Sequence, residues 1–320
     1  MRALITGING FAGSHLARLL LGEGWEVWGT ARSAGSLDRV TPFRDRVRMR
    51  RADLTAKGWE EIVAEATPRV VFHLAGRTSV PASWEDPLAT LRTNATGAAR
   101  LLEAVRRQAP EARVLLIGSC EEYGPAPRAE LPLTEDSRLR PCTPYGISKL
   151  CQSLLGLSYA RRWGLGVVVV RSFSYTGPGQ DRRHLVPDLA RQVAAAERGL
   201  GPPVLRVGNL APRRDLGDVR DVVRGYLLAA TGGRVGEVYN LATGHSRSVA
   251  EVLESLRRLA RVPVRVEQEA RRVRTVDLPD LRGDAGKLRE ATGWVPAIPW
   301  ERSLADVLEH WRTRPAAQLR

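Results

Sequence analysis

The chain has 320 residues, of which 43% are hydrophobic and 26% charged. These values exclude a disordered chain, a coiled coil and a collagen-like fibre. A chain of this length buries enough apolar surface to fold without a disulfide or metal staple, and the usual domain size predicts two structural units or one large one. Its three cysteines, Cys120, Cys142 and Cys151, lack metal-ligand spacing, and their odd number argues against a disulfide framework. A reducing cytoplasmic location is therefore expected.

The formal net charge is +14, yet only Lys57, Lys149 and Lys287 among the 49 basic residues are lysine. A charge this high is typical of proteins with an anionic partner. The arginines are scattered among acids, and no basic run is interleaved with aromatic residues, so nucleic-acid binding is not expected. The longest apolar stretch, residues 167–170, is too short to cross a bilayer, and no secretory signal precedes the first strand, so no membrane partner is expected.

Strand and helix patterns alternate through the first half of the chain. We expect strands at residues 3–5, 26–30, 46–50, 70–74, 114–117 and 167–170, and helices at 11–21, 59–65, 89–108 and 146–163. Repeated strand–helix units imply right-handed crossovers, and therefore an α/β fold with a doubly wound parallel sheet covered by helices on both faces.

The pattern loosens after Arg171, where loops with Gly177-Pro178-Gly179 begin. We therefore place a first domain at residues 1–172, with residues 214–243 returning to it, and a smaller C-terminal domain at residues 173–320; the motifs described next predict that the first binds a dinucleotide and the second the substrate. A closing helix is expected at residues 304–311.

The first strand leads directly into a glycine-rich turn. Its sequence, Thr6-Gly7-Ile8-Asn9-Gly10-Phe11-Ala12-Gly13, precedes an amphipathic helix. Glycines at these positions allow a tight turn and a close approach of backbone N–H groups to a pyrophosphate, which the helix N-terminus also favours. The turn can also be a plain strand-to-helix connection, but its place in the chain favours dinucleotide binding.

The end of the second strand bears on the choice of cofactor. An acidic residue there would bind the ribose 2′-hydroxyl of NAD. The sequence instead has Thr30-Ala31-Arg32-Ser33. Arg32 can receive a 2′-phosphate, which favours NADP(H) and leaves NAD(H) possible, although Arg32 can also be an ordinary surface arginine.

Tyr145 and Lys149 lie four residues apart on a predicted helix and therefore share a face. A nearby cation favours the phenolate, which brings a tyrosine toward useful proton transfer. Upstream, the segment Gly118–Gly124 follows a strand directly, and ligands bind at strand ends in open parallel sheets.

Together these motifs resemble the extended short-chain dehydrogenase/reductase superfamily, in the group that acts on nucleotide sugars. The resemblance covers essentially the whole chain. Its motifs are Thr6–Gly13, Asp53-Leu54, His73-Leu74-Ala75-Gly76, Asn94, Ser119 with Tyr145 and Lys149, and Arg171 with Phe173. The resemblance implies a Rossmann-type fold, a catalytic triad of Ser119, Tyr145 and Lys149, and a dimer through helices 89–108 and 146–163. In that triad Ser119 hydrogen-bonds the sugar oxygen, Tyr145 transfers the proton, and Lys149 holds the nicotinamide ribose and lowers the pKa of the tyrosine.

The same resemblance implies a set of cofactor contacts: Gly7, Asn9, Gly10, Phe11, Gly13, Arg32, Asp53, Leu54, Leu74, Ala75 and Asn94, together with Tyr145 and Lys149. Downstream segments are similar to those of GDP-4-keto-6-deoxy-D-mannose reductases and, less closely, GDP-mannose 4,6-dehydratases. On the substrate side this similarity implies contacts from Arg206, Asn209 and Arg214, the last to the diphosphate, and from Arg274 and Asp277 to the guanosine ribose.

One departure from the family pattern concerns the sugar. The family has Phe-Asn-His before the Gly-Pro-Gly segment, whereas this chain has Phe173-Ser174-Tyr175. The expected activity is NADP(H)-dependent reduction of a GDP-4-keto-6-deoxy-hexose. The alternatives are a GDP-mannose 4,6-dehydratase with Glu121 as base, a 4-epimerase, and a protein that only binds the dinucleotide.

Overall fold

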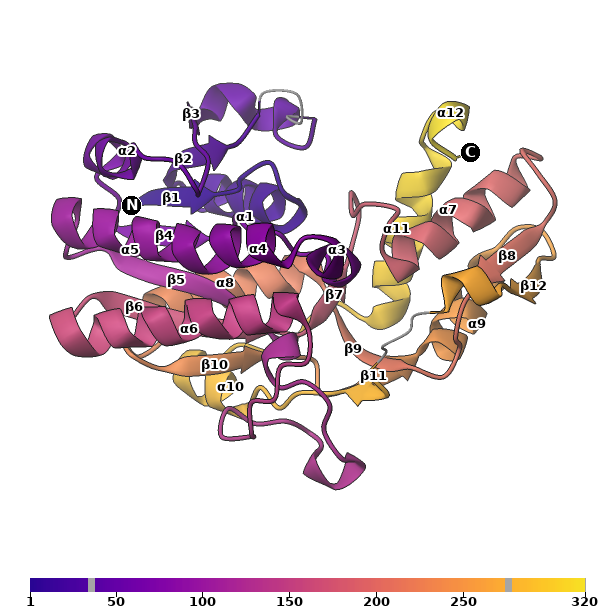
Figure 1. Cartoon of the computed structure of the whole chain (residues 1–320). Helices are drawn as coiled ribbons and strands as arrows, with labels where there is room; N and C mark the ends of the chain where they lie inside the picture. Colours follow the sequence, from indigo (N-terminus) through magenta and orange to yellow (C-terminus); the bar gives the residue numbers. More distant parts are fainter. Residues whose placement is uncertain (34–37, 274–277, 320) are drawn as a thin grey trace.

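A seven-stranded parallel sheet forms the centre of the N-terminal part of the chain (Figure 1). The computed structural model describes residues 1–33, 38–273 and 278–319. The strand order is β10-β6-β5-β4-β1-β2-β3. The strands are β1 (Arg2–Thr6), β2 (Glu26–Ala31), β3 (Val47–Arg51), β4 (Val70–His73), β5 (Arg113–Ser119), β6 (Gly166–Ser172) and β10 (Val238–Leu241). The order reverses between β1 and β4, where ligands bind in sheets of this kind. The predicted doubly wound α/β class is therefore confirmed.

Helices cover both faces of this sheet. They are α1 (Phe11–Gly22), α2 (Trp59–Ala66), α5 (Gly97–Gln108), α6 (Pro144–Trp163), α8 (Val219–Gly232) and α10 (Gly286–Thr292). Because successive strand side chains alternate between faces, Phe72 joins the core beneath α1 and α8, whereas Val71 joins the core beneath α2 and α5. Burial on both faces explains the unbroken apolar runs of the inner strands, such as residues 167–170 in β6, whereas the edge strand β3 is largely exposed and carries three arginines.

The long helix expected at residues 89–108 is divided in the structure. After α3 (Val80–Glu85), α4 (Pro87–Leu91) begins with the Asp86 carboxylate accepting a hydrogen bond of 2.9 Å from the Ala89 N–H. A π-helical turn, Arg92–Thr96, separates α4 from α5. Single π turns within helices occur frequently at functional sites, and this one carries the buried Asn94.

A smaller unit follows β6 (Figure 1). It contains a four-stranded sheet, β11-β9-β13 with β7 also paired to β9, and a two-stranded sheet of β12 and β8. Its strands are β7 (Ser174–Thr176), β8 (Val204–Val207), β9 (Arg213–Asp218), β11 (Ser246–Ser248), β12 (Arg265–Gln268) and β13 (Asp280–Leu281). Its helices are α7 (Leu185–Glu197), α9 (Val249–Leu259), α11 (Trp300–Arg312) and α12 (Ala316–Leu319). Helix α11, predicted at 304–311, packs Leu304 and Leu308 into a core shared with α7 and α9.

Short 3₁₀ segments complete the connections: Thr41–Arg46, Cys120–Glu122, Arg128–Glu130 and Ala270–Arg272. Among the described residues no helix combines the length and apolar character needed to span a membrane.

Candidate active site

The glycine-rich turn lies at the switch point of the sheet, between β1 and α1. Gly7 adopts a φ of +71°, and a Cβ there would lie 2.9 Å from the Cα of Ala75. The turn is held by the Gly7 N–H, which donates to the Thr30 carbonyl at 3.0 Å. A side chain at Gly13 would collide with the Gly7 carbonyl. Only glycine fits these two positions, and α1 begins beside the turn with its N-terminal N–H groups available for an anion.

Arg39 links this turn to the second unit, a contact that the sequence pattern did not reveal. Its Nε donates to the Gly179 carbonyl at 3.0 Å and its Nη1 to the Asn9 carbonyl at 3.5 Å. His15 on α1 makes a parallel contact, with Nε2 3.0 Å from the Pro178 carbonyl oxygen. The segment formed by the glycine turn and α1 is therefore joined to the 177–179 loop by the side chains of Arg39 and His15.

Arg32 and Asp53 lie at the ends of neighbouring strands. The Arg32 side chain is exposed, and its positive charge lowers the pKa of Asp53 as a minor contribution. The main causes are hydrogen bonds from Thr55, whose backbone N–H and hydroxyl donate to Asp53 Oδ1 at 2.8 and 2.7 Å. A charged Asp53 and an exposed Arg32 therefore face the same end of the sheet, with Leu54 buried beside them.

Asn94 makes internal hydrogen bonds at the same sheet edge. Its Oδ1 accepts from the Arg77 N–H at 2.8 Å, and its Nδ2 donates to the Arg77 carbonyl and to Ser148 Oγ, both at 2.9 Å. Ser148 Oγ in turn donates to the Tyr145 carbonyl at 2.7 Å. Asn94 thus connects the loop after β4 to the helix that carries Tyr145, in addition to any contact with a ligand.

His73 ends β4 and lies fully buried near Lys149. Its Nδ1 is 2.9 Å from Thr6 Oγ1, and its Nε2 has no partner in the described structure. Burial, with a smaller contribution from the Lys149 charge, lowers its pKa to about 3. His73 is therefore neutral at physiological pH. The unpaired buried nitrogen and the glycine cradle both fit a bound dinucleotide.

Ser119, Tyr145 and Lys149 converge where β5 ends against α6. Tyr145 lies in the first turn of α6, which Thr143 caps by accepting a hydrogen bond of 3.0 Å from the Gly146 N–H. The Ser119 hydroxyl accepts from the Glu121 N–H at 3.2 Å, and it lies near enough to the Tyr145 phenol to lower the pKa of that group. The structure thus brings together the serine and tyrosine that the sequence placed 26 positions apart.

Lys149 is buried under the same site. Its Nζ donates to the Ile117 carbonyl at 2.7 Å and to Gln152 Oε1 at 3.2 Å. Burial lowers the pKa of Lys149 to about 8, and the charge of Glu122 opposes this change. Gln152 is not among the residues predicted from the sequence. Its position three residues after Lys149 would have predicted that the two side chains share one face of α6.

The pKa of Tyr145 differs in direction from the sequence-based expectation. Burial raises it above the usual value for a phenol, while the hydrogen bond with Ser119 acts in the opposite direction. The negative charge of Glu121 contributes a smaller increase, which places Glu121 within electrostatic reach of the phenol. In this ligand-free chain Tyr145 is therefore a protonated acid at neutral pH.

The substrate residues expected on the second unit fall into two groups. Arg214 on β9 donates from Nη1 to the Leu278 carbonyl at 2.6 Å, and its charge acts on the pKa of Cys120, the residue after Ser119. Arg214 is therefore close to the catalytic strand end. Arg274 and Asp277 lie outside the described residues.

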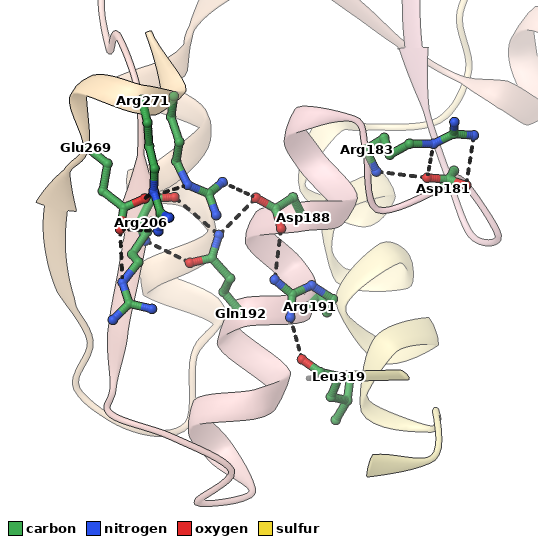
Figure 2. Close-up of polar contacts among 10 residues, drawn as sticks. Asp181, Arg183, Asp188, Arg191, Gln192, Arg206, Glu269, Arg271 and Leu319 are labelled. Atoms are coloured by element: carbon green, nitrogen blue, oxygen red, sulfur yellow. Dashed lines mark hydrogen bonds and ion pairs between the residues drawn. The ribbon is translucent and has the colours of Figure 1, made fainter. Parts of the chain in front are cut away.

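Arg206 lies on β8 in a polar network of the second unit (Figure 2), and Asn209 follows the same strand. Arg206 is exposed on β8, with Nε 3.3 Å from Glu269 Oε1 and its backbone N–H donating to Gln192 Oε1 at 2.7 Å. Glu269 also pairs with Arg271, and Asp188 pairs with Arg191. Asn209 is exposed and accepts from the Ala211 N–H at 3.0 Å. Arg206 thus sits in an ion-pair network of the second unit.

Comparisons with known proteins agree with this arrangement. A family model described as GDP-mannose 4,6 dehydratase matches residues 4–307. The chain is 33% identical over 313 residues to a GDP-6-deoxy-D-mannose reductase from Pseudomonas aeruginosa, with 98% of each chain covered. The structure of RMD from P. aeruginosa complexed with NADPH has a TM-score of 0.84 at 31% identity, covering 98% of this chain and 100% of that one.

A third similarity is to an epimerase. The UDP-glucose 4-epimerase of Thermus thermophilus, solved in complex with NAD, has a TM-score of 0.86 at 30% identity, covering 98% of this chain and 99% of that one. The glycine turn and the Ser119–Tyr145–Lys149 group therefore lie in a fold shared with a reductase and with an epimerase.

Proposed function

This chain belongs to the family described as GDP-mannose 4,6 dehydratase, a nucleotide-sugar branch of the short-chain dehydrogenase/reductases, and on that premise we propose that it is an NADP(H)-dependent reductase of a GDP-4-keto-6-deoxy-hexose. The preferred substrate is GDP-4-keto-6-deoxy-D-mannose, which gives GDP-D-rhamnose. The observation that carries the proposal is the convergence of Ser119 and Tyr145, whose side chains interact electrostatically, beside the buried Lys149. It is supported by the 33% identity to the reductase of P. aeruginosa over nearly the whole chain.

The chain's own groups suit reduction of a ketone. Ser119 is placed to donate to the sugar C4 oxygen, and Tyr145, protonated at neutral pH, gives its proton to that oxygen as negative charge develops. The Lys149 ammonium favours the phenolate that remains. When bound, NADPH supplies the hydride to sugar C4.

The dinucleotide would be held by residues at the carboxyl end of β1, β2, β4 and β5. The backbone of Gly7, Gly10 and Gly13 with the N-terminus of α1 suits the pyrophosphate. The exposed Arg32, with Ser33 beside it, suits a 2′-phosphate. The NADPH complex of the P. aeruginosa structure favours NADP(H), whereas the NAD complex of the T. thermophilus epimerase keeps NAD(H) as the second choice.

For the sugar nucleotide we propose Arg214 as the diphosphate contact, with Arg274 and Asp277 at the ribose. Arg206 and Asn209 are retained as substrate contacts, with the condition that Arg206 must leave its ion pair with Glu269 on binding. The division into residues 1–172 with 214–243, and 173–320, is likewise proposed. It is supported by β10, which pairs with β6, and by α8, which packs on the seven-stranded sheet.

A homodimer in the cytoplasm completes the proposal. Ile147 and Leu154 lie seven residues apart on α6 with 42% and 52% of their surface exposed, and Trp84 and Leu88 on α3 and α4 are exposed at 56% and 70%. Exposed large apolar residues on these helices are typical of a contact surface. Sedimentation analysis of the wild type and of Leu154→Glu tests it: we expect the dimer to dissociate in the variant.

A GDP-mannose 4,6-dehydratase remains the second candidate, because the family description names that activity and Glu121 acts electrostatically on Tyr145. A 4-epimerase is a third. The deciding experiment has two arms. With NADPH and GDP-4-keto-6-deoxymannose, we expect a product heavier by two hydrogens. With GDP-mannose alone, we expect no loss of water, whereas formation of the 4-keto-6-deoxy sugar would establish the dehydratase.

A further inference from the structure

A second carboxylate, Glu122, lies completely buried beneath Ser119. Its Oε1 accepts hydrogen bonds from the Ser119 N–H at 2.9 Å and from Ser153 Oγ at 3.0 Å. Its Oε2 accepts from Arg171 Nε at 2.9 Å, in an ion pair whose side chains are 0% and 5% exposed. A buried charge pair costs desolvation energy that a pair of apolar side chains would avoid, so its presence under a reaction site calls for a specific role.

Arg171 has little freedom to move. Its Nη1 donates to the Tyr123 hydroxyl and to the Glu135 carbonyl, both at 3.2 Å, and its guanidinium lies 5.0 Å from the centre of the Tyr123 ring. Tyr123 is itself fixed, because its hydroxyl donates to Asn240 Oδ1 at 2.7 Å. A fully hydrogen-bonded buried network of this kind is rigid, and it specifies one position for the Glu122 carboxylate.

Two consequences for Ser119 follow from that position. The bond from its N–H to Glu122 fixes the backbone at the end of β5. The Glu121 N–H then occupies one acceptor site of the Ser119 hydroxyl, which leaves its single proton available to donate to the sugar C4 oxygen beside Tyr145. Gly118 is also constrained, because a Cβ there would collide with Glu122 Oε1. The carboxylate therefore positions the serine through its main chain.

Glu122 also acts on Lys149, whose pKa its negative charge raises. Among the described residues, the groups that shift the pKa of Lys149 are its own burial, which lowers it, and the negative charge of Glu122, which raises it. The other titratable groups around it are His73 on β4, which is neutral at physiological pH, and Tyr145 on its own helix. A buried ammonium is stabilised by nearby negative charge, and Glu122, which is also paired with Arg171, contributes such a charge at Lys149.

We propose that the buried Glu122–Arg171 pair is a positioning unit for the reaction, in which Glu122 aligns Ser119 and provides the counter-charge of Lys149. The catalytic part of this inference rests on the proposed function. The electrostatic part does not rest on the proposed function, because it concerns only the charges of Glu122, Arg171 and Lys149 and involves no substrate. The pair is distinct from Glu121, which faces the phenol and has been considered as a base.

The rarity of lysine in this chain makes a direct test possible. Replacing Lys57 and Lys287 by arginine leaves Lys149 as the single lysine and keeps the net charge. The protein labelled with ¹³C at lysine Cε gives one side-chain NMR signal, whose pH titration reports Lys149. We expect a pKa of about 8 in this background, and a decrease of about one unit in Glu122→Gln, at the lower end of what loss of an opposite charge produces.

Two further variants separate alignment from charge. Glu122→Asp keeps the charge with a shorter reach, so Lys149 should titrate close to the background value while kcat falls. Glu197→Gln is the matched control, since Glu197 forms a buried ion pair with Arg312 in the second unit, 2.6 Å between Oε1 and Nη2. It should leave both the Lys149 titration and kcat unchanged. Should Glu122→Gln fail to fold, Glu122→Asp takes its place in the kinetic arm, where the charge is kept and only the alignment of Ser119 changes.

Kinetics supply the second arm. With the keto sugar and NADPH, Glu122→Gln should reduce kcat at least about tenfold at pH 8 and less at pH 6, where Lys149 regains its proton, with partial recovery in Glu122→Asp. A Lys149 titration unchanged by loss of Glu122, or a kcat loss equal at all pH values and not improved in Glu122→Asp, overturns the positioning role. A wild type without reductase activity defeats only the proposed function, because the NMR titration needs no substrate.

Discussion

Lys149 donates a hydrogen bond of 2.7 Å from Nζ to the carbonyl oxygen of Ile117, two residues before Ser119 on the same strand. The ammonium is therefore held against the strand that carries the serine. Burial brings its pKa down to about 8, so the charge of Lys149 changes within the range in which the enzyme can be assayed.

The pH dependence of kcat/KM should reflect this lysine. Lys149 is charged below its pKa and neutral above it, so we expect kcat/KM for the keto sugar to fall as the pH rises through about 8. The buried His73, with a pKa of about 3, should add no change near pH 6.5. Initial rates from pH 5.5 to 9.5 check this. A profile flat to pH 9.5 would show that the lysine charge plays no part.

Tyr145→Phe removes the proposed proton donor and keeps the ring. General acid catalysis is typically worth about 10²–10⁴-fold, so kcat should fall by that amount while the Kd for NADPH stays nearly constant. Tyr159→Phe on the same helix is the control, because its phenol faces Glu103 at 3.4 Å and should be dispensable. An effect confined to KM would mean that Tyr145 only orients the substrate.

Arg32→Asp should change the choice of dinucleotide. The wild type is expected to bind NADPH more tightly than NADH, since the exposed guanidinium suits a 2′-phosphate, and an aspartate there should reverse the order by favouring the ribose hydroxyl. Fluorescence titration with both cofactors measures this. Arg44→Asp, an exposed arginine near β3, controls for the change in net charge. Equal preference in wild type and variant would remove Arg32 from the cofactor site.

Asn94→Ala should destabilise the fold around the site. The substitution removes three buried hydrogen bonds that join the loop after β4 to Ser148 and leaves their partners unsatisfied. Such losses cost about 1 kcal/mol or more each, so Tm should fall by several degrees. Thermal unfolding with and without NADPH is the measurement. An unchanged Tm would mean that water replaces the amide without loss.

The sequence predicted those parts of the site that depend on local order. The four-residue spacing of Tyr145 and Lys149 places both on one side of α6, and the glycine turn sits where a strand leads into a helix. The Glu122–Arg171 ion pair joins residues 49 positions apart through the pairing of β5 with β6, so no local pattern indicates it. The sequence also could not predict that the pKa of Tyr145 is raised, because this shift depends on the burial of the phenol in the folded site.

The break in the predicted helix 89–108 has a similar origin. Its apolar spacing is helical although Asn94, Thr96 and Gly97 are weak helix formers, and periodicity does not distinguish an α turn from a π turn. The π turn carries Asn94, which meets Arg77 and Ser148 from other parts of the chain. The predicted helix is therefore interrupted at the turn whose Asn94 makes these tertiary contacts.

Glu121→Gln separates the reductase from the dehydratase. A dehydratase oxidises C4, removes the C5 proton, expels the C6 hydroxyl as water and returns the hydride, so it needs a base that a ketoreductase does not. Glu121 lies close enough for its charge to raise the pKa of Tyr145, and a dehydratase would use it as that base. The variant keeps the shape of the side chain and removes its basicity.

For a reductase, Glu121→Gln should still reduce the 4-keto sugar within about tenfold of the wild type, a loss of about 1.4 kcal/mol in transition-state stabilisation. The wild type should release no water from GDP-mannose and should leave added NADPH unconsumed with it. Mass analysis of the sugar nucleotides and absorbance of NADPH give both readings. Conversion of GDP-mannose to the 4-keto-6-deoxy sugar by the wild type, abolished in Glu121→Gln, would assign Glu121 as the base and the chain as a dehydratase.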